Sequence, residues 1–319
     1  MSITNVVCGI DIGGTNTSIG IVDRDGSILD RMRVGTRQFD HAEAYFKQVA
    51  DVIQLFFKSH SEYKLCGIGI GAPNGNFYTG NIEFAPNLKW QGVIKVTEIM
   101  QNFLPGIPVV LTNDANAAAL GEKYYGSASG KKDFILITLG TGVGSGIVVN
   151  DQLVYGHDGF AGEIGHTIYD PEGRQCGCGR RGCLETYASA SGMVRSAYEF
   201  LEKDKRDSLL RDIKKEEITA AHIGDAAAKG DELALNIFDY TAKILGIKLA
   251  DAVAHTSPST IYIFGGVANA GDILMKPLKR YFNEYLLTIF KDKIGLEFSG
   301  LPQNDAAVLG SAALVNHTL

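Results

Sequence analysis

The segment 139–183 constrains this chain more than any other part of its sequence. It begins with a turn in which every second residue is glycine, at Gly140, Gly142, Gly144 and Gly146. It continues with a carboxylate and an imidazole three residues apart, Glu163 and His166, and ends in three cysteines. Glycine lets backbone N–H groups approach an anion closely, and consecutive N–H groups form a nest for it. The segment therefore predicts a phosphate-binding turn beside a pocket that a metal ion shapes.

Length and charge limit the class of protein. A chain of 319 residues suffices for two domains with cores of their own. Its net charge of -6 argues against a nucleic-acid-binding surface, which needs a basic face. No apolar run approaches the roughly 20 residues of a membrane span, and the first residues lack the pattern of a signal peptide. Five cysteines, three of them clustered, do not make a disulfide framework, so we expect a cytoplasmic protein without a membrane partner.

Strands and helices alternate along the chain, as in α/β proteins. Apolar runs bounded by turn residues predict strands at 6–10, 17–22, 28–34, 65–70, 107–112, 134–139, 145–149, 260–264 and 296–299. Helical spacing predicts helices at 40–58, with Asp40 as its N-cap, and at 115–122, 188–256, 277–290 and 305–317. We expect an N-terminal α/β domain over 1–113, completed by the C-terminal helix within 301–319, and a C-terminal α/β domain over 114–300.

Two strand–turn–strand units predict two similar halves that face each other. The first turn carries Asp11, Gly13, Gly14, Thr15 and Asn16, and the second carries Thr141 and Gly142. Each turn by itself is also compatible with an ordinary hairpin, but the glycine density of the second favours phosphate binding by both. Asp11 adds a carboxylate oxygen of the kind that Mg²⁺ prefers. A third turn, Gly265-Gly266, either accommodates a nucleoside or simply begins a helix.

Asn113 and Asp114 stand where a strand gives way to a helix. A capping residue there satisfies free helix N–H groups. The helix dipole also keeps a carboxylate ionised, and an ionised carboxylate accepts a proton from a hydroxyl during phosphoryl transfer. The sequence leaves both roles open for Asp114.

One histidine and three cysteines lie within 18 residues, at His166, Cys176, Cys178 and Cys183. Three thiolates and an imidazole make a tetrahedral structural zinc site, and the alternative is a chance grouping of reduced cysteines. Glu163 and, just after the last cysteine, Glu185 are then either surface carboxylates or acceptors for the hydroxyls of a polyol. Fixed carboxylates and an imidazole beside a metal suit a sugar, which offers several donors in fixed directions.

These motifs together resemble the ROK family (repressors, open reading frames and sugar kinases) over essentially the whole chain. The resemblance rests on DIGGTNTS, GAPNG, APNLKW, TNDANAAALGE, LGTGVGSGIVVNDQLVYGHDGFAGEIGH, CGCGRRGCLE and IFGGVANAG. It implies the actin-like ATPase (ribonuclease H-like) fold, in which two α/β domains surround a central cleft that binds ATP.

The resemblance also implies roles for individual residues. Asp114 is expected to be the general base, and the sugar is expected to contact Asn87, Asn113, Asp114, Glu163, His166 and Glu185. ATP and Mg²⁺ are expected at Asp11, Gly13, Gly14, Thr15, Asn16, Thr141, Gly142, Gly265 and Gly266. A structural Zn²⁺ is expected on His166, Cys176, Cys178 and Cys183.

Within the family, the pattern is most similar to the glucokinase branch, so we expect ATP-dependent phosphorylation of the glucose 6-hydroxyl. Kinases of N-acetylglucosamine, N-acetylmannosamine, fructose or allose remain alternatives, because they share most of these residues. The non-enzymatic alternative is a sugar-sensing protein on the same fold. Regulators of the family carry a DNA-binding domain before the first strand, which here begins by Val6, so we expect a kinase. The family also suggests a homodimer.

Overall fold

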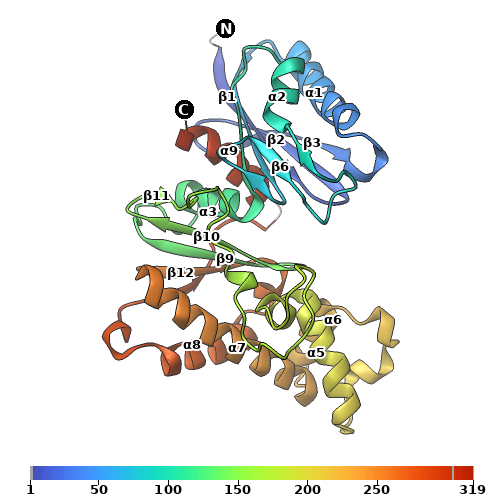
Figure 1. The fold of residues 1–319 in the computed structure, drawn as a ribbon, viewed down its shortest axis with the longest axis vertical. Helices are drawn as coiled ribbons and strands as arrows, with labels where there is room; N and C mark the ends of the chain where they lie inside the picture. The colour runs from blue at the N-terminus through green and yellow to red at the C-terminus, as the bar shows by residue number, and fades with distance from the viewer. Residues whose placement is uncertain (1–2, 304, 319) are drawn as a thin grey trace.

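The structure is a computed structural model that describes residues 3–303 and 305–318. Two five-stranded sheets dominate the described chain (Figure 1). The first has the order β3-β2-β1-β4-β8, with β1 (Thr4–Ile12), β2 (Asn16–Val22), β3 (Ile28–Gly35), β4 (Tyr63–Ala72) and β8 (Val109–Asn113). The second has the order β11-β10-β9-β12-β13, with β9 (Phe134–Leu139), β10 (Val143–Val149), β11 (Gln152–Leu153), β12 (Thr260–Phe264) and β13 (Gly295–Phe298). A small sheet joins β5 (Gly75–Asn76), β6 (Asn81–Glu83) and β7 (Val93–Ile94).

The two large sheets repeat one topology. In each, three successive strands pair antiparallel, and two later strands add in parallel beside the first strand of that group. The tight turn of each hairpin therefore lies at the carboxyl end of the parallel strands, where α/β sheets bind ligands. This repeat confirms the two strand–turn–strand units predicted from the sequence.

Alternation of side chains along the strands divides the core into layers. In β9, Ile135 and Ile137 face a cluster formed with the large C-terminal helices, whereas Phe134 and Leu136 face the opposite side. The helices of the first cluster are α4 (Glu185–Ala188), α5 (Ala190–Lys203), α6 (Ala220–Ala228), α7 (Glu232–Thr256) and α8 (Asp272–Tyr285). The outer face of the first sheet packs in the same way on α1 (Ala42–Ser59) and α2 (Val96–Phe103).

Two helices fill the space between the sheets: α3 (Asp114–Tyr125) and α9 (Ala306–Thr318) (Figure 1). They pack against each other; α9 also contacts β1 and β4, while α3 contacts β9 and β10. The C-terminal helix therefore returns to the first sheet. The domain boundary at residues 113 and 114 stays a prediction.

Three helix predictions were wrong in detail. Asp40 does not cap α1: the N-cap is His41, without a side-chain bond, and Asp40 pairs with Lys89 instead. The predicted helix at 188–256 is three helices, α5, α6 and α7. A charged segment separates α5 from α6, and Asp231 caps the start of α7. Pro277 lies inside α8 rather than at its start, although proline favours the first turn. Among the described residues, no helix is both long and apolar enough to cross a membrane.

Candidate active site

A cleft of about 450 Å³ opens between the two hairpin turns. Most of the predicted site residues line it: Asp11, Gly13, Gly14, Asn87, Asn113, Asp114, Thr141, Gly142, Glu163, His166, Glu185 and Gly265. Predicted residues that do not line it are Thr15, Asn16 and Gly266, together with Cys176, Cys178 and Cys183. The cleft thus brings together both glycine turns, the start of α3 and the loop that carries Glu163 and His166.

The first glycine turn joins β1 to β2 and lies against the loop that contains Asn87. The Gly13 N–H donates to the carbonyl of Asn16 at 3.0 Å, which closes the turn. The carbonyl of Gly14 accepts from Nε of Arg37 at 3.2 Å. A Cβ on Gly14 would lie 2.6 Å from the carbonyl oxygen of Asn87, so only glycine permits this approach. The first turn and the Asn87 loop therefore share one wall of the cleft.

The second glycine turn joins β9 to β10 on the opposite wall. The Gly140 N–H donates to the carbonyl of Gly142 at 3.1 Å. Gly265, at the end of β12, has φ +103° and lies so close to Leu139 that an added Cβ would be 2.6 Å from its carbonyl oxygen. The third predicted turn is thus adjacent to the second. Gly266 begins a short 3₁₀ helix outside the cleft lining.

The start of α3 presents Asp114 to the cleft. Asn113 is the N-cap, since its Oδ1 accepts from the Ala115 N–H at 2.9 Å. Oδ1 of Asp114, the first helical residue, accepts from the same N–H at 2.8 Å. The Asp114 side chain is exposed in the open cleft. The protein atoms packed around its carboxylate still desolvate it, and this raises the pKa of Asp114 despite the bond from the Ala115 N–H. Asp114 is therefore a stronger proton acceptor than an ordinary aspartate.

Asp11 lies near Asp114 at the first turn. Burial, together with the negative charge of Asp114, raises the pKa of Asp11 to about 7. Desolvation likewise raises the pKa of Glu163. Among the described residues, the lining of the cleft contains four carboxylates and no lysine or arginine. The carboxylates are those of Asp11, Asp114, Glu163 and Glu185. An anionic ligand in this cleft therefore needs a cation and backbone N–H groups for its charge.

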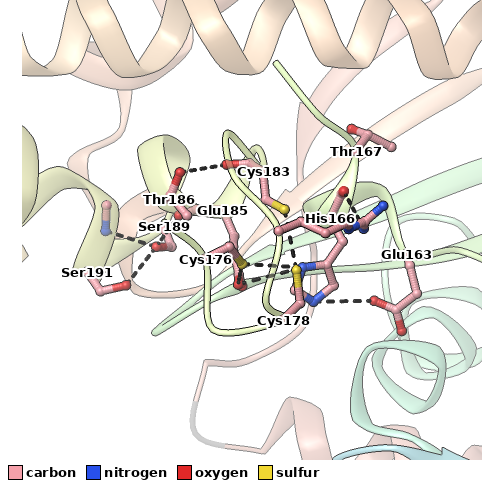
Figure 2. A network of polar contacts seen from close by, with 12 residues as sticks. Glu163, His166, Thr167, Cys176, Cys178, Cys183, Glu185, Thr186, Ser189 and Ser191 are labelled. Carbon is pink, nitrogen blue, oxygen red and sulfur yellow. Dashed lines mark hydrogen bonds and ion pairs between the residues drawn. The ribbon is translucent and has the colours of Figure 1, made fainter. Parts of the chain in front are cut away.

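His166 and the three predicted cysteines form one cluster behind the cleft (Figure 2). One ligand atom from each lies within 4.8 Å of all the others. Sγ of Cys178 is 3.6 Å from Sγ of Cys183, and Sγ of Cys176 is 3.7 Å from Nδ1 of His166. Zn–S bonds of about 2.3 Å in a tetrahedron place two sulfurs about 3.8 Å apart. The donor set and its spacing thus fit a zinc ion.

The two ring nitrogens of His166 face different neighbours. Nδ1 faces the cysteines, whereas Nε2 is 4.0 Å from Oε2 of Glu163, toward the cleft. This leaves one nitrogen for a metal and one for a ligand, a division that the sequence suggested and that stays a prediction. Glu185 has a less simple position than expected, because its Oε1 accepts from Sγ of Cys176 at 3.0 Å and lies 3.7 Å from Nδ1 of His166. Glu185 therefore contacts the cluster as well as the cleft.

Several residues of the cleft were missed by sequence reasoning. Asn116 is 3% exposed, and its Oδ1 has no hydrogen-bond partner among the described residues. Thr138 on β9 occupies the position that Asp11 has before the first turn, and Phe160 contributes an aromatic ring from the loop before Glu163. The TNDAN motif and the matching strand–turn–strand patterns were signals for Asn116 and Thr138. No comparable signal marks Phe160.

Comparisons with known proteins agree with this architecture. The sequence profile described as "ROK family" matches residues 7–318. A glucokinase of Halalkalibacterium halodurans is 39% identical, over 96% of this chain and 94% of its own, and one of Thermotoga maritima is 34% identical, over 98% and 97%. A crystal structure of a ROK family glucokinase from Streptomyces griseus, in complex with glucose and AMPPNP, matches with a TM-score of 0.80 and 34% identity, covering 97% of this chain and 98% of that one. The predicted actin-like ATPase fold is thereby confirmed.

Proposed function

The chain belongs to the ROK family, and from this premise we propose that it is an ATP-dependent kinase that phosphorylates the 6-hydroxyl of glucose. One observation carries the proposal: Asp114, with its raised pKa, stands in a cleft between two glycine turns. A general base must be ionised in the reacting complex yet basic enough to accept a proton. Asp114 would take the proton of the attacking hydroxyl as the γ-phosphoryl group of ATP is transferred.

The sugar side of the cleft is the region around Asn113, Glu163 and His166. Asn113 has an amide nitrogen to donate, the Glu163 carboxylate accepts, and Nε2 of His166 faces the cleft while Nδ1 faces the cysteines. Two more residues would contact the sugar: Asn87, from the wall that carries the first turn, and Glu185, from beside the cysteine cluster. Acceptors and donors in fixed positions distinguish one hexose from another, because an unpaired buried polar group is costly.

The phosphate side comprises the two glycine turns. Their backbone N–H groups would bind the phosphates of ATP: Gly13, Gly14, Thr15 and Asn16 on one wall, and Thr141 and Gly142 on the other, with Gly265 and Gly266 beside the adenosine. Asp11 would hold Mg²⁺, whose charge neutralises the phosphates when it is bound. The four carboxylates of the cleft, with no basic residue among its described lining, support a requirement for that cation.

A zinc ion on His166, Cys176, Cys178 and Cys183 would be structural, with four protein ligands and no open position. It would fix the orientation of the imidazole and keep the proton on the nitrogen that faces the cleft. We also propose a cytoplasmic homodimer, on the family resemblance alone; light scattering of the purified protein would test the assembly.

A sugar panel with ATP tests the proposed function. Coupled assays of ADP formation should give the highest kcat/KM for glucose, and lower values for mannose, fructose, allose, N-acetylglucosamine and N-acetylmannosamine. A higher kcat/KM for another hexose would assign the chain to that alternative kinase. ADP formation that no sugar stimulates, together with measurable glucose binding, would instead support the sugar-sensing alternative.

A further inference from the structure

The second glycine turn is held by a segment 50 residues farther along the chain. The N–H of Ala190 donates to the carbonyl of Gly140 at 2.8 Å. The hydroxyl of Ser191 donates to the carbonyl of Thr141 at 2.7 Å. Both donors belong to the first turn of α5, and Ser191 is exposed to solvent. Two successive carbonyls of the turn are therefore fixed from outside their own hairpin.

The same segment also contacts the third residue of the turn. A Cβ added to Gly142 would lie 2.7 Å from Oε2 of Glu185, so the carboxylate rests directly against this glycine. The other oxygen of Glu185 accepts from Cys176. Glu185 therefore stands between the second turn and the cysteine cluster.

Residues 185–191, which we call the α4–α5 corner, are tied together internally (Figure 2). The hydroxyl of Ser189 donates to the carbonyl of Glu185 at 2.6 Å and accepts from the Gly192 N–H at 3.0 Å, as the N-cap of α5. Oγ of Ser189 is also 3.0 Å from Oγ of Ser191. Each hydroxyl has a single proton, and both protons already go to carbonyls, that of Glu185 and that of Thr141. The Ser189–Ser191 contact is therefore a packing contact, and Ser191 holds the turn by its own bond to Thr141.

Fixing the carbonyls of a turn also fixes the N–H groups that alternate with them. A preorganised set of N–H groups binds an anion better than a set that must first become ordered. We propose that Ser191 is a positioning residue for the nucleotide: its hydroxyl holds the second glycine turn in the conformation that binds the phosphates of ATP. This inference rests on the proposed function, since it assigns ATP to that turn.

The test is nucleotide affinity in Ser191→Ala. Calorimetry with AMPPNP and Mg²⁺ should give a Kd raised about fivefold, the effect of one lost hydrogen bond. Glucose affinity should change by less than about twofold. It can be measured by the fluorescence of Trp90, the single tryptophan of the chain, which is buried in the same loop as Asn87. The melting temperature should stay at the wild-type value, because Ser191 is exposed.

Two further variants separate positioning from stability. Ser191→Thr keeps the hydroxyl and should restore the nucleotide Kd to within about twofold of wild type. Ser189→Ala removes the helix cap and should lower the melting temperature. The inference would be overturned if the nucleotide Kd of Ser191→Ala stayed within about twofold of the wild-type value. It would also be overturned if Ser191→Thr bound the nucleotide as weakly as Ser191→Ala. An affinity loss that follows the melting temperature across all three variants would overturn it as well. A wild-type protein that binds no AMPPNP would instead overturn the proposed function.

Discussion

The two glycine turns of this protein share a hairpin geometry and differ in what surrounds them. The first lies against a backbone carbonyl of the Asn87 loop and follows a carboxylate, Asp11. The second follows a neutral hydroxyl, Thr138, and is held by the α4–α5 corner. The repeat of one topology thus gives two equivalent backbone sites with different charge and different anchors. The first would carry the cation that accompanies ATP, and the second is linked to the cysteine cluster.

The largest effect is expected at Asp114, which lies between the two turns and belongs to neither. Asp114→Asn keeps the shape of the side chain but cannot accept a proton. General-base catalysis contributes about 100- to 10,000-fold, so kcat should fall by at least about 100-fold while glucose still binds. Steady-state assays with Trp90 fluorescence as the binding control check this. A variant that retains more than about a tenth of wild-type kcat would exclude Asp114 as the base.

Disrupting the cysteine cluster, which adjoins the second turn, should weaken sugar binding and lower stability. Cys178→Ser should reduce zinc from about one per chain, lower the melting temperature, and raise the KM for glucose about 10- to 100-fold. The KM for ATP should rise less, since the cluster reaches the second turn indirectly, through Glu185. Cys66→Ser, at a half-buried cysteine outside the cluster, is the matched control and should keep its zinc. Fully active wild-type protein with less than about a tenth of an equivalent of zinc would contradict this reading.

The charge difference between the turns predicts a pH dependence. Asp11 has a pKa raised to about 7, so it is increasingly protonated as the pH falls through that value. Only the ionised form would hold the proposed Mg²⁺, and kcat/KM should therefore fall below pH 7, by about tenfold per pH unit at low Mg²⁺. Raising the Mg²⁺ concentration should move this limb to lower pH, because the bound cation favours the ionised form. A profile that is flat from pH 6 to 8 at every Mg²⁺ concentration would remove Asp11 from this role.

The smallest effects are expected from alanine substitutions that compare the turns directly. Gly14→Ala brings a Cβ against the backbone oxygen of Asn87, at 2.6 Å, whereas Gly142→Ala meets the movable carboxylate of Glu185, at 2.7 Å. The KM for ATP should rise about tenfold in the first and about fivefold in the second. Gly140→Ala meets nothing within 4 Å and should change the KM by about twofold at most. Equal effects in all three would mean that the surroundings of the turns do not matter.

The sequence predicted the parts of the molecule in which chemistry and local pattern coincide. Glycine turns after apolar strands and the His166, Cys176, Cys178 and Cys183 cluster were predicted, because each is marked by a local spacing of glycines or of possible metal ligands. The helix that contains Pro277 was placed incorrectly, because tertiary packing overrode a local preference. The bond from Ser191 to Thr141 joins residues 50 positions apart, and no local pattern encodes such a contact. Asn116 differs, because the TNDAN motif did mark its position, but not that its amide would be buried in the cleft.

The most direct test of the proposed function is the identity of the product. The purified wild-type protein would be incubated with glucose, ATP and Mg²⁺, and the reaction followed by ³¹P nuclear magnetic resonance with proton coupling. The account predicts ADP and a phosphomonoester whose phosphorus couples to the two protons of C6. An ester at another carbon, or ADP and inorganic phosphate without any sugar ester, would contradict it.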